Sequence, residues 1–79
     1  MNHTLIEQLK SQLSFLRKEW KQEDEAREYA LADMMTLDDD DPDMAFALCE
    51  FESAEIRLEE IEDDILDLEF QIKEEEEKA

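Results

Sequence analysis

Residues Met44–Ile72 read MAFALCEFESAEIRLEEIEDDILDLEFQI, and apolar residues recur there at alternating steps of three and four. This spacing places them on one side of an α-helix, in the heptad pattern of a coiled coil. All nine positions of the stripe, the seam of this helix, are apolar: Met44, Ala47, Phe51, Ala54, Leu58, Ile61, Ile65, Leu68 and Ile72. We therefore predict a helix at about 42–76 that buries its seam against another helix.

A second seam with the same spacing precedes this stretch. Its positions are Ile6, Leu9, Leu13, Leu16, Trp20, Glu23, Arg27, Ala30, Met34 and Leu37. It is apolar at both ends and polar in the middle, at Glu23 and Arg27. The pattern predicts a helix at about 4–37, with Thr4 and Glu7 forming a capping box at its start.

An acidic turn at residues 38–43 separates the two expected helices. Asp41 suits the N-cap of the second helix, and Pro42 suits its first position, where a missing amide hydrogen costs nothing. If the chain folds back here, residues whose numbers sum to 81 share a layer, for example Leu13 with Leu68. On the flank of the seam we expect Arg17 near Glu62.

The fold class we predict is all-α: a single domain, residues 1–79, forming an antiparallel two-helix coiled-coil hairpin that can dimerise into a four-helix bundle. The alternative is a parallel dimer of one long helix. Pro42 and the aspartates before it disfavour that alternative, because a residue before proline resists helical dihedral angles.

Composition excludes several kinds of site. The chain has no glycine, so no glycine-rich phosphate loop exists, and its single cysteine, Cys49, cannot form an internal disulfide. The aspartates at 38–43 lack the glycine and closing glutamate of a calcium loop, and His3 has no second zinc ligand near it. We expect no catalytic residues, no metal, no cofactor and no enzyme activity. We also expect a cytoplasmic protein, in the host cell if a phage encodes it.

Negative charge is concentrated in the second half of the chain. Residues 37–79 contain 19 acidic and three basic side chains, a net charge of −16 out of −18 for the whole chain. Solubility of a small domain needs a net charge of only about 2–8 in magnitude. The excess favours a partner with a basic surface, and it argues against direct binding to nucleic acid or to an anionic membrane.

Carboxylates of the second helix recur at three- and four-residue steps. We interpret seven of them as a partner-binding acidic face: Glu52, Glu55, Glu59, Glu62, Asp63, Asp67 and Glu69. Side chains four residues apart stand about 6 Å apart along a helix, which is similar to the phosphate spacing of one DNA strand. The hypothesis is a mimic of nucleic-acid charge; the alternative is a solvated face that keeps the protein soluble.

Several large apolar residues fall outside both seams. Those we assign to partner binding or dimerisation are Phe15, Tyr29, Phe46, Ile56, Leu66 and Phe70. A two-helix hairpin cannot cover them, and exposed apolar patches usually mark an interface. Self-association into a homodimer and docking of a target both remain open, and a dimer built on Phe15 and Tyr29 brings less negative charge together.

In composition and size the chain resembles the small acidic DNA-mimic inhibitors made by bacteriophages and mobile elements. The resemblance is one of charge and shape. It implies an anti-CRISPR or anti-restriction type of protein that blocks the basic DNA- or RNA-binding cleft of a host protein. The alternatives are a coiled-coil adaptor or assembly protein that binds a helical partner through an apolar stripe, and an acidic chaperone for a basic client.

Overall fold

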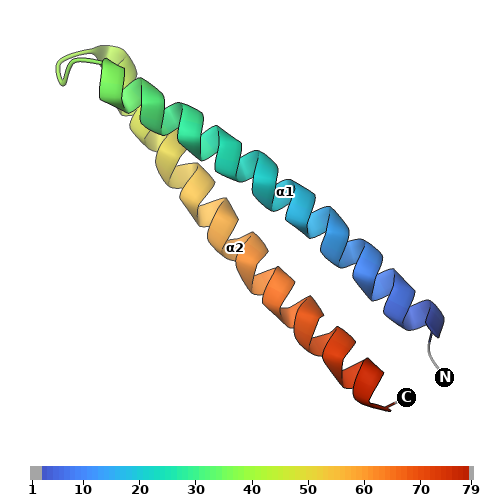
Figure 1. Ribbon diagram of the computed structural model, residues 1–79. Coiled ribbons are helices and arrows are strands. Elements are labelled where there is room, and N and C mark those ends of the chain that lie inside the picture. Colours follow the sequence, from blue (N-terminus) through green and yellow to red (C-terminus); the bar gives the residue numbers. More distant parts are fainter. Residues whose placement is uncertain (1–2, 79) are drawn as a thin grey trace.

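The computed structural model describes residues 3–78 and shows two long helices joined by a short turn (Figure 1). Helix α1 spans His3–Thr36 and helix α2 spans Pro42–Lys78. They lie side by side and antiparallel, in a rod with extents of 60 × 14 × 13 Å. The predicted all-α hairpin is confirmed, and the start of α1 and the end of α2 lie at the same end of the rod.

The core is the contact between the two seams. Leu9, Leu13, Leu68 and Ile72 are buried together near the open end of the hairpin, and Leu16 and Ile65 pack against them. This grouping agrees with layers whose residue numbers sum to 81. Every described seam position of both helices is buried or half-buried.

Closer to the turn, small residues form the core. Ala30, Ala47 and Ala54 are buried, together with Leu58. The distance between packed helices depends on the side chains at their contact, so alanines let the two backbones approach closely. The buried alanines of the described residues thus lie in the half of the rod near the turn.

The turn ends α1 and begins α2 through local hydrogen bonds. The Asp41 carboxylate accepts the Asp43 amide hydrogen at 2.9 Å, and the Asp41 amide donates to the Asp38 carbonyl at 3.0 Å. Pro42 is the first residue of α2. The predicted N-cap is therefore confirmed: Asp41 satisfies an amide that α2 itself cannot bond, and its charge suits the positive end of the helix dipole.

The helix ends differ slightly from the sequence-based boundaries. Thr4 is a helical residue inside α1, so it is not the N-cap, and the predicted capping box is wrong. At the other end α1 stops at Thr36, whose hydroxyl donates to the Asp33 carbonyl, while α2 continues to Lys78. Terminal turns contribute little packing, so an apolar pattern fixes their limits poorly.

A core truncation should destabilise the hairpin far more than the same truncation on the surface. Leu58 is 3% exposed, whereas Leu66 on the same helix is 64% exposed. We expect Leu58→Ala to lower the free energy of unfolding by about 2–3 kcal/mol, because it leaves a cavity. Leu66→Ala should change it by less than about 0.5 kcal/mol. Urea titrations followed by circular dichroism at one protein concentration measure both; equal losses would contradict the assigned seam.

The cap at Asp41 should also be measurable. We expect Asp41→Ala to destabilise the protein by about 1 kcal/mol, since the Asp43 amide loses its acceptor. Asp39→Ala removes the same charge from the same turn, and no hydrogen bond of the Asp39 side chain is present in the described part of the chain. The difference between the two midpoints of thermal unfolding isolates the cap. Equal midpoints would show that the hydrogen bond contributes nothing.

Candidate protein-binding surfaces

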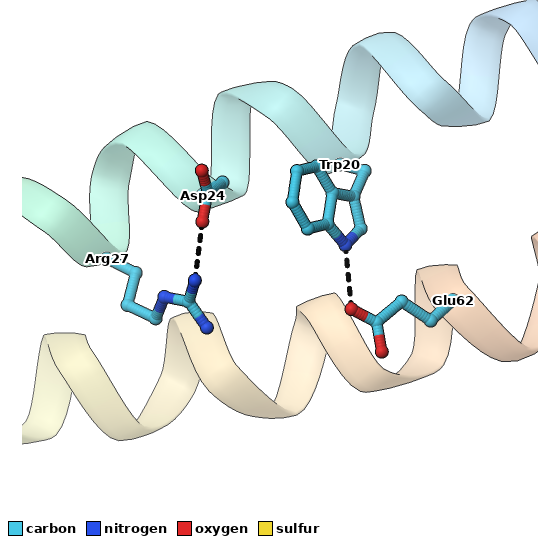
Figure 2. Close-up of polar contacts among 4 residues, drawn as sticks. All are labelled: Trp20, Asp24, Arg27 and Glu62. Atoms are coloured by element: carbon cyan, nitrogen blue, oxygen red, sulfur yellow. Dashed lines mark hydrogen bonds and ion pairs between the residues drawn. The ribbon is translucent and has the colours of Figure 1, made fainter.

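A polar zone interrupts the seam in its middle. The Trp20 indole N–H, on α1, donates to a Glu62 carboxylate oxygen of α2 at 2.9 Å, and Figure 2 shows both side chains directed across the gap between the helices. The indole fills a seam position with its apolar ring and binds the neighbouring helix with its polar edge. Glu62 is thereby held in place beside the core.

The two charged seam residues are also paired. Glu23 accepts a charge-assisted hydrogen bond from Arg57 Nε at 2.8 Å, and the Arg27 guanidinium bonds to Asp24 (Figure 2). No buried side-chain nitrogen or oxygen in residues 3–78 lacks a hydrogen-bond partner. Such directional contacts select one register more than they add stability.

One flanking ion pair differs from the expectation. Arg17 lies beside Glu69, with Nη2 3.7 Å from Oε1, and not beside Glu62. The reason is the tilt of helical side chains toward the N-terminus of their own helix. In an antiparallel pair this tilt directs Arg17 toward residues farther along α2 than its own layer.

The seven carboxylates of the predicted acidic face are all exposed on α2. Glu62 and Glu69 are engaged by Trp20 and Arg17, as described above. Within residues 3–78 no hydrogen bond or ion pair holds the other five, which are Glu52, Glu55, Glu59, Asp63 and Asp67. Folding therefore leaves most of this face to water or to a partner.

The density of charge along α2 is close to that of a nucleic-acid strand. Ten carboxylates lie between Glu50 and Glu69. At 1.5 Å per residue this segment is about 29 Å long, which gives one carboxylate per about 3 Å. One strand of DNA carries one phosphate per about 3.4 Å of helix axis. Only Arg57 adds positive charge to the segment, and it is turned toward Glu23.

Three of the apolar residues lie inside the acidic face. At about 100° per residue, Ile56, Leu66 and Phe70 fall within an arc of about 80° on the side of α2 away from α1. All three are more than half exposed. Phe46 is equally exposed but lies on a different flank of α2, so the arrangement does not bring it to the other three. The arc could have been found from the sequence by projecting the exposed positions and not only the seam.

The remaining two, Phe15 and Tyr29, belong to α1. They are 62% and 75% exposed and point away from the seam. The structure therefore separates the predicted apolar set into a pair on α1, three residues on the outward side of α2, and Phe46 by itself. Sequence reasoning listed them together because it placed each residue relative to the seam alone.

No further kind of site is evident in the part of the chain described here. Among residues 3–78 no cluster of three or more His, Cys, Asp and Glu side chains is arranged to hold a metal ion. Neither described helix has a stretch that is apolar and long enough to cross a membrane. No protein-family model, curated protein or solved structure matches the chain.

The crowding of carboxylates should make stability rise with salt. The four ion pairs found among the described residues are exposed or half-buried and contribute about 1 kcal/mol or less each, whereas the net charge is −18. Raising NaCl from about 0.02 to 0.5 M shortens the screening length from about 20 to about 4 Å, so repulsion weakens more than attraction. We expect the thermal midpoint to increase. A constant or falling midpoint would show that repulsion between the carboxylates of α2 does not destabilise the protein.

Proposed function

We propose that this protein is a small acidic inhibitor that presents nucleic-acid-like charge and blocks the basic DNA- or RNA-binding cleft of a host protein. It acts by binding, without catalysis, and does not itself bind nucleic acid. The observation that supports the proposal is the charge density of α2, where carboxylates between residues 50 and 69 follow one another about as closely as phosphates on one strand. Anti-CRISPR and anti-restriction proteins of phages are inhibitors of this kind.

The shape of the rod suits such a cleft. The backbone of the rod extends 60 × 14 × 13 Å. With side chains each helix is about 10–12 Å across, so the two side by side are about 20 Å wide, close to the width of a DNA duplex. The rod is also stiffened by the packing of α1 against α2 along its length, so the backbone positions that carry its charges are fixed. A partner that binds fixed charges loses less conformational freedom than one that must order them.

Charge and apolar groups have separate tasks in this mechanism. Carboxylates that no intrachain partner neutralises attract a basic surface and accelerate association, with a strong dependence on salt. Ile56, Leu66 and Phe70, in the middle of these carboxylates, then pack against the target and slow release. A surface that is acidic for solubility alone has no need of these apolar side chains. Their presence among the carboxylates therefore favours a specific protein partner.

A coiled-coil adaptor is the second candidate. It is favoured by the exposed apolar side chains on both helices, which could pair with another helical protein. In that case the carboxylates serve solubility and choice of partner. We also infer that the acting unit is a homodimer located in the cytoplasm of the host cell.

Neutralising the outward carboxylates should weaken target binding without unfolding the hairpin. The variant Glu55→Gln, Glu59→Gln, Asp63→Asn, Asp67→Asn keeps side-chain size and removes four charges that no ion pair uses. If each contributes about 0.5 kcal/mol, affinity should fall by about 30-fold. We would measure it with immobilised protein and bacterial lysate, identifying retained proteins by mass spectrometry and displacing them with duplex DNA.

The matched control removes the same charge elsewhere. The variant Asp38→Asn, Asp39→Asn, Asp40→Asn, Glu28→Gln also changes the net charge from −18 to −14, but leaves the outward side of α2 intact. It should retain the target. If the two variants lost target binding equally, the net charge of the protein, and not the position of its carboxylates, would determine binding. If the target protein stays bound in the presence of both duplex DNA and about 0.5 M NaCl, the protein is a coiled-coil adaptor and not an inhibitor of this kind.

A further inference from the structure

A long stripe on α1 is left uncovered by the hairpin. It lies on one side of the helix and consists of Ser11, Phe15, Lys18, Gln22, Tyr29 and Asp33, all of which are exposed. Phe15 and Tyr29 are its only large apolar members, and Gln22 lies midway between them. This stripe carries much less charge than the outward side of α2, where carboxylates dominate.

The charge of α1 is divided along its length. Residues 3–22 contain four basic and two acidic side chains, a net charge of +2. Residues 23–36 contain one basic and five acidic side chains, a net charge of −4. A second α1 laid antiparallel places each positive half against a negative half, whereas a parallel one opposes like charges. The stripe is therefore complementary to itself in one orientation only.

We propose that a second copy of this chain covers the stripe, with the two α1 helices antiparallel about a two-fold axis at Gln22. In a two-fold interface, residue i meets residue j and j meets i. An axis at Gln22 pairs Phe15 of each copy with Tyr29 of the other. The two apolar residues that the hairpin exposes on this stripe are then both buried.

Local features fit this register. Lys18 of one copy faces Glu25 of the other, and the symmetry repeats this opposite-charge pair. A shallow hollow beside Tyr29 is lined by Glu25, Glu28 and Ala32. Because helical side chains tilt toward their own N-terminus, Phe15 of the second copy leans toward Ala32 and into this hollow.

The area available is adequate. A stable interface takes about 800 Å² from each partner, roughly an eighth of the 6174 Å² surface of the chain. One of the four long sides of the rod supplies that much. The contact uses α1, so both copies of α2 stay outside, and their negative charges are kept apart. It extends the homodimer proposed above, yet its failure would leave the role of α2 untouched.

Measuring the oligomeric state tests whether the stripe on α1 is the dimer interface. In sedimentation equilibrium the wild-type chain should have twice its monomer mass of 9.4 kDa. Phe15→Glu with Tyr29→Glu should raise the dimer dissociation constant about 100-fold or more, since buried aromatic anchors dominate such contacts. Circular dichroism checks that the variant stays helical. The matched control, Ile56→Glu with Phe70→Glu, changes two equally exposed residues of α2 and should remain dimeric.

Cross-linking tests the register. In a Cys49→Ser background, Gln22→Cys places the new thiols at the two-fold axis, where oxidation should yield a covalent dimer. Gln8→Cys is equally exposed, but the two copies of residue 8 would be about 40 Å apart, so it should stay uncoupled.

Three results would overturn the proposal. The first is a wild-type monomer at millimolar concentration. The second is a dimer lost through the α2 control pair and not through Phe15 and Tyr29. The third is a dimer in which Gln8→Cys cross-links as readily as Gln22→Cys, because a parallel arrangement brings both pairs of thiols together.

Discussion

The seam of α2 must be covered, and the rest of the structure follows from that requirement. It runs from Met44 to Ile72 without a polar interruption, so an isolated α2 would expose a continuous apolar stripe to water. The turn at Asp38–Pro42 solves the problem within one chain by returning α1 along the same face. Burial of Leu58, Leu68 and Ile72 is thus both the main source of stability and the reason for the antiparallel topology.

Covering the seam with α1 also resolves an electrostatic difficulty. A second copy of α2 would offer an equally good apolar stripe, but it would bring another net charge of −12 alongside. Helix α1 is close to neutral and supplies Arg17 and Trp20 as partners for Glu69 and Glu62. The molecule therefore has a helix that provides structural support and a helix that is free to display charge. The separation explains how so acidic a chain can maintain a fixed shape.

The sequence predicts the helices, the turn and the register, because each depends on a period or on a residue with restricted chemistry. The 3-4 spacing fixes which residues are buried, and Asp41 with Pro42 fixes where α2 begins. Contacts that depend on side-chain direction escaped prediction. Arg17 pairs with Glu69 because of side-chain tilt, and the bond from Trp20 to Glu62 requires a rotamer that no spacing specifies. Thr4 was misplaced because little packing defines a helix end.

The hairpin also has a mechanical consequence. Both ends of the described chain lie at one pole of the rod, and the turn lies at the other (Figure 1). A force applied between the ends would load the layer of Leu9 and Ile72 first, and then each following layer in sequence. The layers would open one at a time, like a zipper, and would not resist together as they would in shear. The same packed layers that together stabilise the hairpin in water therefore resist only weakly a force that pulls the start of α1 away from the end of α2.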